Sequence, residues 1–138
     1  MIASLKDQLI RDEELRLKPY RDSLGKLTIG VGRNLGDVGI SVQEAGVFLA
    51  NDIAAATIAL ESAFPWTDAL DDVRRCALVN MAFNLGIRGL SEFKDFLGKV
   101  QTGDFENAAA AMLDSLWAKQ VGARAERLAK QIISGEWQ

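Results

Sequence analysis

The sequence contains no histidine and a single cysteine, Cys76, among its 138 residues. One cysteine cannot form a disulfide within the chain, which fits folding in a reducing compartment. Histidine and cysteine are the residues that usually bind zinc, so we expect no zinc site. A protease is disfavoured as well, because there is no histidine base to activate a nucleophile. Cys76 falls on the apolar side of a helical pattern, which predicts a buried packing thiol.

Long apolar runs are also missing. The first residues show no signal-peptide pattern, and no later stretch reaches the roughly 18 consecutive apolar residues that span a membrane. We therefore expect a cytoplasmic chain without a signal peptide and without stable membrane insertion. If it acts beyond the cytoplasm, another component must release it.

Basic residues are absent from residues 37–72, which carry seven acidic side chains. Residues 1–36 and 73–138 each have a net charge of +2, so the overall charge of −3 hides two mildly basic ends. These ends suit a polyanionic partner weakly, and a solvated acidic helix face explains the middle equally well. A basic stripe with interleaved aromatic residues is missing, so we expect no nucleic-acid partner.

The first third of the chain reads as a helix followed by a hairpin. Apolar residues at helical spacing predict a helix over 3–13, and alternation predicts strands over 17–20 and 26–31. Pro19 and the turn residues 22–25 interrupt any helix there. Ser41 and Glu44 form a capping-box pattern, which predicts a long helix over 41–63.

The remaining two thirds read as helical. Asp71 is placed to cap a helix that ends near Leu85 before Gly86, and Asp104 to cap a helix over 105–113. Further helices are expected near 91–100 and 123–133. The chain is therefore predicted to be α+β. We expect a single domain over residues 1–138, with a small lobe over about 14–40 plus the first helix, a linking helix over 41–63 and a helical lobe over 64–138.

Two carboxylates and a threonine near the start of the chain are the strongest chemical signal. Glu13 ends the first predicted helix, Asp22 follows nine residues later in the turn, and Thr28 six residues after that on a strand. Carboxylates on separate elements that face each other across a gap are the minimal apparatus for cleaving a glycosidic bond. Taken singly, each has an ordinary alternative: Glu13 as a surface acid, Asp22 as a turn residue and Thr28 as a strand residue.

Asp52 falls on the apolar stripe of the predicted long helix, which also includes Phe48, Leu49 and Ile53. An acid on an apolar face needs a partner, and Arg33 at the end of the hairpin is the candidate. The alternative is that Asp52 lies at the edge of the stripe in water.

Three sets of residues in register resemble the T-even phage lysozyme family, the endolysins of glycoside hydrolase family 24. They span nearly the whole chain. The first set is Asp12–Glu13, Leu15–Lys18, Tyr20, Asp22 and Thr28–Gly30; the second is Asp71, Val73–Leu78, Asn80–Met81 and Phe83; the third is Trp117, Gln120, Arg124–Ala125 and Gly135–Trp137.

The resemblance implies a lysozyme-like fold and an inverting muramidase that cleaves the β-1,4 bond between N-acetylmuramic acid and N-acetylglucosamine in bacterial peptidoglycan. It implies that Glu13 is the general acid, that Asp22 assists attack on the anomeric carbon and that Thr28 holds the water. By the same match Asn84 and Arg124 line the cleft, and Arg124 pairs with Glu13. No metal or cofactor is implied. We expect a monomer that stays in the host cytoplasm until a separate membrane-permeabilising protein releases it.

The chain departs from the family pattern at several positions. Arg33 replaces a histidine that pairs with the acid matching Asp52, Glu14 replaces a glycine beside the acid, and the segment 34–40 is short. Three alternatives stay open: a non-catalytic peptidoglycan-binding domain, a tail-associated hydrolase, and a transglycosylase. The presence of both Asp22 and Thr28 favours hydrolysis, because these side chains would position a water.

Overall fold

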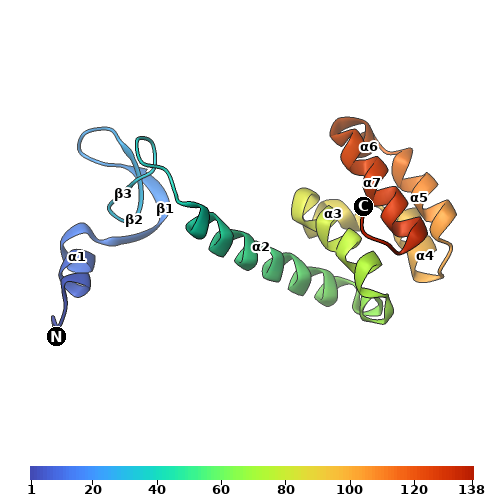
Figure 1. Cartoon of the computed structure of the whole chain (residues 1–138), viewed down its shortest axis with the longest axis horizontal. Helices are drawn as coiled ribbons and strands as arrows, with labels where there is room; N and C mark the ends of the chain where they lie inside the picture. Colours follow the sequence, from blue (N-terminus) through green and yellow to red (C-terminus); the bar gives the residue numbers. More distant parts are fainter. The chain divides into compact units, whose positions relative to one another are not determined.

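The computed structural model describes all 138 residues and confirms an α+β fold (Figure 1). The chain divides into two compact units, residues 1–48 and 49–138, with the division inside one helix. The elements are, in order, α1 (Leu5–Glu13), β1 (Leu15–Arg21), β2 (Leu27–Val31), β3 (Arg33–Asn34), α2 (Val42–Ala63), the 3-10 helix η1 (Pro65–Ala69), α3 (Asp72–Ser91), α4 (Lys94–Gln101), α5 (Phe105–Leu113), α6 (Leu116–Val121) and α7 (Ala123–Ser134).

The first unit is built around an antiparallel sheet of order β1-β2-β3. The predicted hairpin is confirmed, and β3 is an addition that the sequence pattern did not indicate. β1 and β2 pair from Leu15 with Val31 to Arg21 with Leu27, and the register shifts between Arg16 and Tyr20. Pro19 lies within that irregular stretch, where its missing N–H costs no ladder bond on an edge strand.

Thr28 is the one buried side chain in this first unit, with 3% of its surface exposed. The apolar residues of α1, Leu5, Leu9 and Ile10, are all exposed. The unit is therefore held by its sheet, its turns and its polar contacts rather than by an apolar core of its own.

Helix α2 begins as its capping box predicts. The Glu44 N–H donates to Ser41 Oγ at 3.1 Å, and the Ser41 N–H donates to Glu44 Oε1 at 2.9 Å. Two backbone donors at the start of the helix are thus satisfied reciprocally. Of the predicted apolar stripe, Leu60 alone is buried, whereas Phe48, Leu49 and Ile53 stay about half exposed.

The expectation that no segment could span a membrane is wrong on length and composition. α2 has 22 residues and is long and apolar enough to cross a bilayer by those two criteria. One such helix is weak evidence, because core helices of soluble proteins pass the same test.

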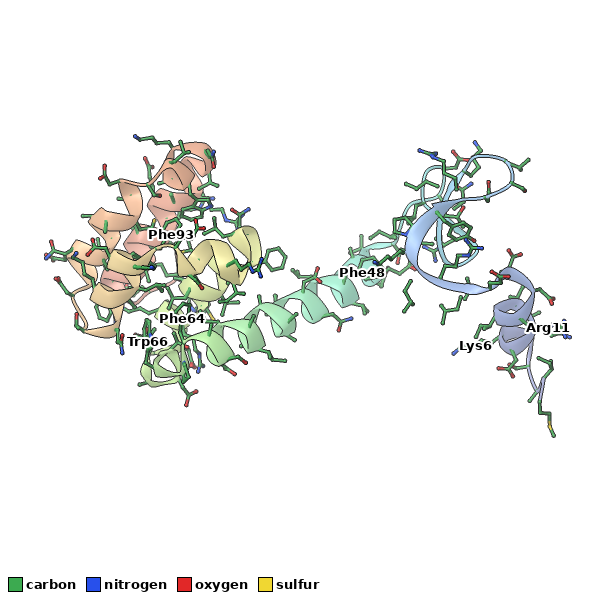
Figure 2. All side chains as sticks on the ribbon, turned by 180° about the vertical axis from the view of Figure 1, so that it is seen from behind. Lys6, Arg11, Phe48, Phe64, Trp66 and Phe93 are labelled. Atoms are coloured by element: carbon green, nitrogen blue, oxygen red, sulfur yellow. The ribbon has the colours of Figure 1, made fainter.

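The second unit contains the hydrophobic core. Helices α3, α4, α5 and α7 pack on one another around it (Figure 1). Figure 2 shows Phe64 and Trp66 close together where α2 gives way to η1, and their ring centroids are 6.2 Å apart. The large side chains that are fully buried are Leu60, Leu78, Met81, Leu90, Phe96, Val100, Met112 and Ile132.

The helix capped by Asp71 ends where predicted. The Asp71 side chain accepts from the Arg74 N–H, as expected, and the helical conformation stops at Gly86, whose φ of 72° and ψ of 160° are not helical. Glycine adopts a positive φ at no steric cost, and α3 therefore consists of two helical segments, one before the kink at Gly86 and one after it that ends at Ser91. Asp104 precedes α5, yet its carboxylate accepts from the Asn107 side chain instead of capping the backbone.

Candidate functional site

Glu13 is the last residue of α1, and its exposed carboxylate has no hydrogen bond or ion pair with another residue of the first unit. The chain turns sharply after it, because Glu14 has a φ of 62° and a ψ of 145°. Glu14 is the one residue other than glycine with a positive φ. Side chains rarely adopt this conformation, so the turn beside the candidate acid is strained.

The Glu13 side chain lies against the backbone at Gly32, just beyond the end of β2. A Cβ atom built at Gly32 would be 2.9 Å from Glu13 Oε2 and 3.2 Å from its Cδ. Gly32 has a φ of 68°, a conformation natural to glycine. The close approach links the end of α1 to the open end of the hairpin, next to the Leu15–Val31 pair.

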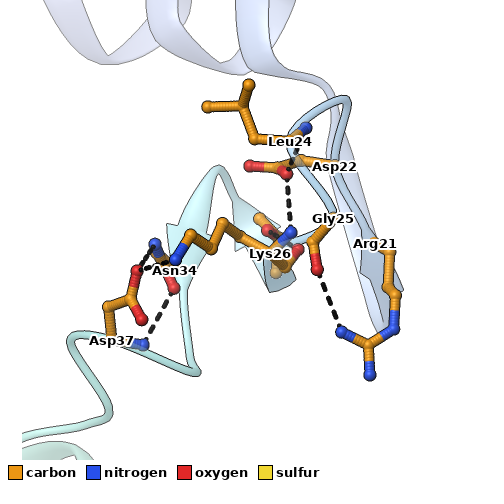
Figure 3. Close-up of polar contacts among 8 residues, drawn as sticks. Arg21, Asp22, Leu24, Gly25, Lys26, Asn34 and Asp37 are labelled. Atoms are coloured by element: carbon orange, nitrogen blue, oxygen red, sulfur yellow. Dashed lines mark hydrogen bonds and ion pairs between the residues drawn. The ribbon is translucent and has the colours of Figure 1, made fainter.

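Asp22 lies in the β1–β2 turn and organises it (Figure 3). Its Oδ1 accepts from the Lys26 N–H at 2.8 Å and from the Leu24 N–H at 2.9 Å. Side-chain acceptors of this kind replace backbone bonds in a tight turn. Oδ2 has no partner in the chain, so one carboxylate oxygen is anchored and the other is free to act on a ligand.

The third predicted catalytic residue, Thr28, follows on β2 opposite Tyr20. Its hydroxyl donates to the Lys26 carbonyl at 2.8 Å, so the single proton is committed. The oxygen still has lone pairs and can accept a hydrogen bond from water. A water held at Thr28 would therefore donate a hydrogen bond to the hydroxyl oxygen.

The turn that contains Asp22 is tied to the loop after β3. Lys26 Nζ pairs with Asp37 Oδ2 at 2.9 Å, and Asn34 donates to the same oxygen at 3.1 Å (Figure 3). The Asp37 N–H in turn donates to Asn34 Oδ1 at 3.0 Å. These bonds hold the base of the turn against β3, even though the segment 34–40 is short.

Arg33 pairs with an acid that the sequence did not indicate as its partner. Its Nη2 lies 2.8 Å from Glu44 Oε2, and its Nη1 donates to Glu44 Oε1 at 2.8 Å and to the Gly39 carbonyl at 3.1 Å. Glu44 lies in the first turn of α2, directly after the loop that Arg33 spans, and both residues belong to the unit of residues 1–48. Asp52 falls in the unit of residues 49–138, and its pairing with Arg33 stays a prediction.

This two-bond contact changes the acid–base behaviour of both groups. The Arg33 guanidinium, followed by the Ser41 N–H, lowers the pKa of Glu44 from 4.5 to about 2. The Glu44 carboxylate correspondingly raises the pKa of Arg33. Glu44 therefore fastens the sheet to α2 while also capping the helix.

Asn84, a predicted substrate-binding residue, holds a tryptophan. Its Oδ1 accepts from the Trp117 Nε1–H at 2.7 Å. An indole can only donate, so this contact fixes which end of the amide faces the ring. Trp117 also packs edge-on against Phe93, with centroids 6.0 Å apart, and lines a hollow of about 560 Å³. The Asn84 Nδ2 group has no partner in the chain and is free to donate.

Arg124, the other predicted binding residue, is held by Asn80. Its Nη2 and Nε donate to Asn80 Oδ1 at 2.7 and 3.0 Å. Both residues line a mostly apolar hollow of about 500 Å³, together with Phe83 and Cys76. Cys76 is half-buried there, so the expected fully buried thiol is wrong. The pairing of Arg124 with Glu13 stays a prediction.

Each unit thus contains its own part of the predicted site. Glu13, Asp22 and Thr28 lie on the α1–hairpin unit, and Asn84 and Arg124 on the helical unit. Sequence reasoning missed the roles of Gly32, Glu44 and Trp117. The closely spaced Gly30 and Gly32 were the one available signal for the role of Gly32. No group of three or more His, Cys, Asp or Glu side chains could hold a metal ion.

Comparison with known proteins places this geometry in a family. Residues 11–131 match the phage lysozyme family. The endolysin of Acyrthosiphon pisum secondary endosymbiont phage 1 is 34% identical and is aligned over 83% of this chain and 78% of its own. The Probable T4-type lysozyme 1 of Dictyostelium discoideum is 27% identical and is aligned over 98% of this chain and 96% of its own.

A longer relative matches equally well. The pre-baseplate central spike protein Gp5 of Enterobacteria phage T4 is 32% identical over 96% of this chain. The alignment covers only 28% of Gp5, so this chain corresponds to about a quarter of that protein.

The chain belongs to the phage lysozyme family. Its class is therefore that of a lysozyme-like glycosidase, for which the family implies a peptidoglycan substrate.

A first prediction concerns the Arg33–Glu44 contact. Because the pKa of Glu44 is lowered in the folded protein, its contribution to stability is complete above about pH 4.5 and is lost as the pH falls toward 2. Glu44→Gln keeps a capping side chain but removes the charge, so its melting temperature should be below that of the wild type at pH 7. The gap should close between pH 4.5 and 2. Asp52→Asn is the control and should show no such gap. A gap for Asp52→Asn and none for Glu44→Gln would mean that Asp52 is the charged partner of Arg33.

A second prediction concerns the strained turn. Glu14→Gly should raise the free energy of unfolding by about 1 kcal/mol, because glycine relieves the positive φ at some cost in chain entropy. Glu14→Ala also removes the carboxylate and its exposed contact with Arg16, but it keeps the Cβ and the strain. Chemical denaturation of both variants separates the two effects. Equal stabilisation by alanine would mean that charge, not backbone strain, is responsible.

Proposed function

We propose that the protein is a phage endolysin that hydrolyses the β-1,4 bond between N-acetylmuramic acid and N-acetylglucosamine in peptidoglycan by an inverting, general-acid mechanism. The observation that carries the proposal is that one sheet-based unit holds two carboxylates, Glu13 and Asp22, each with an oxygen that has no polar partner within that unit. The family match over residues 11–131 supports the substrate class.

Glu13 acts as the general acid in this proposal. A sugar oxygen is a poor leaving group unless it is protonated, so the acid must hold a proton beside the bond that breaks. The Glu13 carboxylate suits this role because no polar partner within its own unit occupies it and because the Gly32 backbone limits where it can lie. The proton passes to the leaving oxygen, and Glu13 becomes a carboxylate.

Asp22 and Thr28 serve the other half of the reaction. Asp22 is fixed through Oδ1 and directs Oδ2 outward, so a negative charge can face the oxocarbenium-like centre and take up the proton of the attacking water. The Thr28 oxygen accepts a hydrogen bond from that water, which leaves a lone pair of the water free to attack. Inversion requires room for the water between sugar and carboxylate.

The helical unit supplies glycan contacts in the same proposal. Asn84 offers its free amide hydrogens next to the Trp117 ring, and Arg124 offers a guanidinium edge beside Asn80. Amide and guanidinium donors match the hydroxyl, acetamido and carboxylate acceptors of peptidoglycan. The reaction needs no cofactor, and the protein works as a monomer. It stays in the host cytoplasm until a separate membrane-permeabilising protein gives it access to the wall.

A tail-associated role is the second candidate, favoured by the match to the pre-baseplate central spike protein Gp5. The chemistry at Glu13 would be the same, but the protein would act at entry rather than at lysis. Detection of the chain in washed virions would favour this role, and its recovery only from the lysate would favour the endolysin role.

The proposed activity predicts the behaviour of two neighbouring carboxylates. Glu13→Gln should reduce the release of muropeptides from purified peptidoglycan by at least about 100-fold, because glutamine cannot supply the proton. Glu14→Gln, the matched control one residue away, should keep activity within a few-fold of the wild type. Mass analysis should find reducing-end muramic acid.

Three other outcomes contradict parts of the proposal. Anhydro sugar products would indicate a transglycosylase. Equal activity of both variants would remove Glu13 from the mechanism. No product from the wild type, together with retained binding to peptidoglycan, would leave a glycan-binding domain.

A further inference from the structure

The space that the Glu13 carboxylate occupies exists because residue 32 has no side chain. The three heavy atoms nearest to a Cβ built at Gly32 all belong to Glu13: Oε2 at 2.9 Å, Cδ at 3.2 Å and Cγ at 3.3 Å. Real Cβ atoms do not approach other heavy atoms closer than 3.0 Å. Any other residue at position 32 would have to displace the Glu13 side chain or move the backbone.

Polar contacts within the first unit do not orient this carboxylate. Glu13 ends α1, and neither of its carboxylate oxygens takes part in a hydrogen bond or an ion pair with another residue of 1–48. Glutamate has three rotatable side-chain bonds, so without a restraint it would occupy several rotamers. The close approach to Gly32 is a place where the backbone limits that freedom.

We propose that Gly32 is a positioning residue, which sets the location of the Glu13 carboxylate by leaving open the space that a side chain at position 32 would fill. The proposal rests on the assignment of Glu13 as the general acid. Gly32 itself carries no reacting group. Its effect is on orientation, and a displacement of about 1 Å in a catalytic group can cost roughly 100-fold in rate.

The chain offers a matched control two residues away. Gly30 lies on β2 and also has a φ of 68°, but a Cβ built there meets no heavy atom within 4 Å. Alanine at either position therefore suffers a similar backbone strain, because both glycines adopt a conformation that side chains rarely take. Only alanine at position 32 also meets Glu13. The difference between the two variants isolates the contact from the strain.

The kinetic test compares Gly32→Ala with Gly30→Ala on soluble glycan fragments of peptidoglycan. Gly32→Ala should lower kcat by roughly 100-fold with KM within about twofold, since a displaced acid impairs the chemical step and not binding. Gly30→Ala should keep kcat within a few-fold. Equal losses in both variants would mean that backbone strain is the cause, and an active Gly32→Ala would overturn the proposal directly.

A structural test does not depend on activity. With carbon-13 label in the glutamate side chains, the Glu13 carboxyl signal should shift in Gly32→Ala and stay in place in Gly30→Ala. If the wild type releases no muropeptides but this signal still moves only in Gly32→Ala, the contact is supported and the proposed function fails. An unmoved signal in both variants overturns the proposal.

A third readout needs no variant and covers the case in which Gly32→Ala does not fold. In the wild-type protein, the Gly32 α-protons should show nuclear Overhauser effects to the Glu13 γ-protons, because the Glu13 Cγ lies close to the position that a Cβ of residue 32 would take. Absence of these effects in a well-folded sample would overturn the proposal.

Discussion

The approach of the Glu13 side chain to the Gly32 backbone is the contact on which the position of the candidate acid depends. It joins the end of α1 to the open end of the hairpin, and it does so without using the carboxylate oxygens. A salt bridge or hydrogen bond would hold the acid more firmly but would also compete with the leaving oxygen for its proton. Steric contact with a glycine limits the position of the carboxylate and leaves its chemistry free.

The two units are stabilised in different ways. The helical unit buries a continuous set of apolar side chains from Leu60 to Ile132, and such burial is the dominant favourable term in folding. The first unit buries Thr28 alone and depends on directional bonds: the Asp22 turn, the Lys26–Asp37 tie and the Arg33–Glu44 contact. Polar ties of this kind fix the orientation of side chains better than they add stability. Stabilisation by polar contacts suits the first unit, whose proposed task is to hold Glu13 and Asp22 in place.

Local sequence signals predicted most of the elements. Capping by Ser41, Glu44 and Asp71, together with apolar periodicity, indicated α2, α3 and the α+β class, because these signals act between neighbouring residues. Gly86 ends the helix capped by Asp71 as predicted, whereas the short helical segment between Gly86 and Ser91 was not predicted. The short strand β3 and the helix α6 have too few residues to show a periodic pattern.

The site was harder to predict than the fold, because its contacts join residues that are distant in the sequence. The spacing of Glu13, Asp22 and Thr28 pointed to a glycosidase, and the family match agrees with that class. The contact of Arg33 with Glu44 was not predicted, because it depends on the path of the loop between β3 and α2. Two hydrogen bonds could be found only from atomic positions. The Thr28 hydroxyl donates to the Lys26 carbonyl, and Asn84 accepts from the Trp117 indole. The glycines at 30 and 32 look alike in sequence, and their surroundings alone distinguish them.

The anomeric configuration of the first product distinguishes inversion from retention. Proton NMR of the new reducing end, recorded before mutarotation, reports whether water attacked from the face opposite the leaving group. We expect the α-anomer, since a β-1,4 bond cleaved with inversion gives an α-hemiacetal. Initial appearance of the β-anomer would mean a covalent intermediate and retention, and would contradict the roles given to Glu13, Asp22 and Thr28.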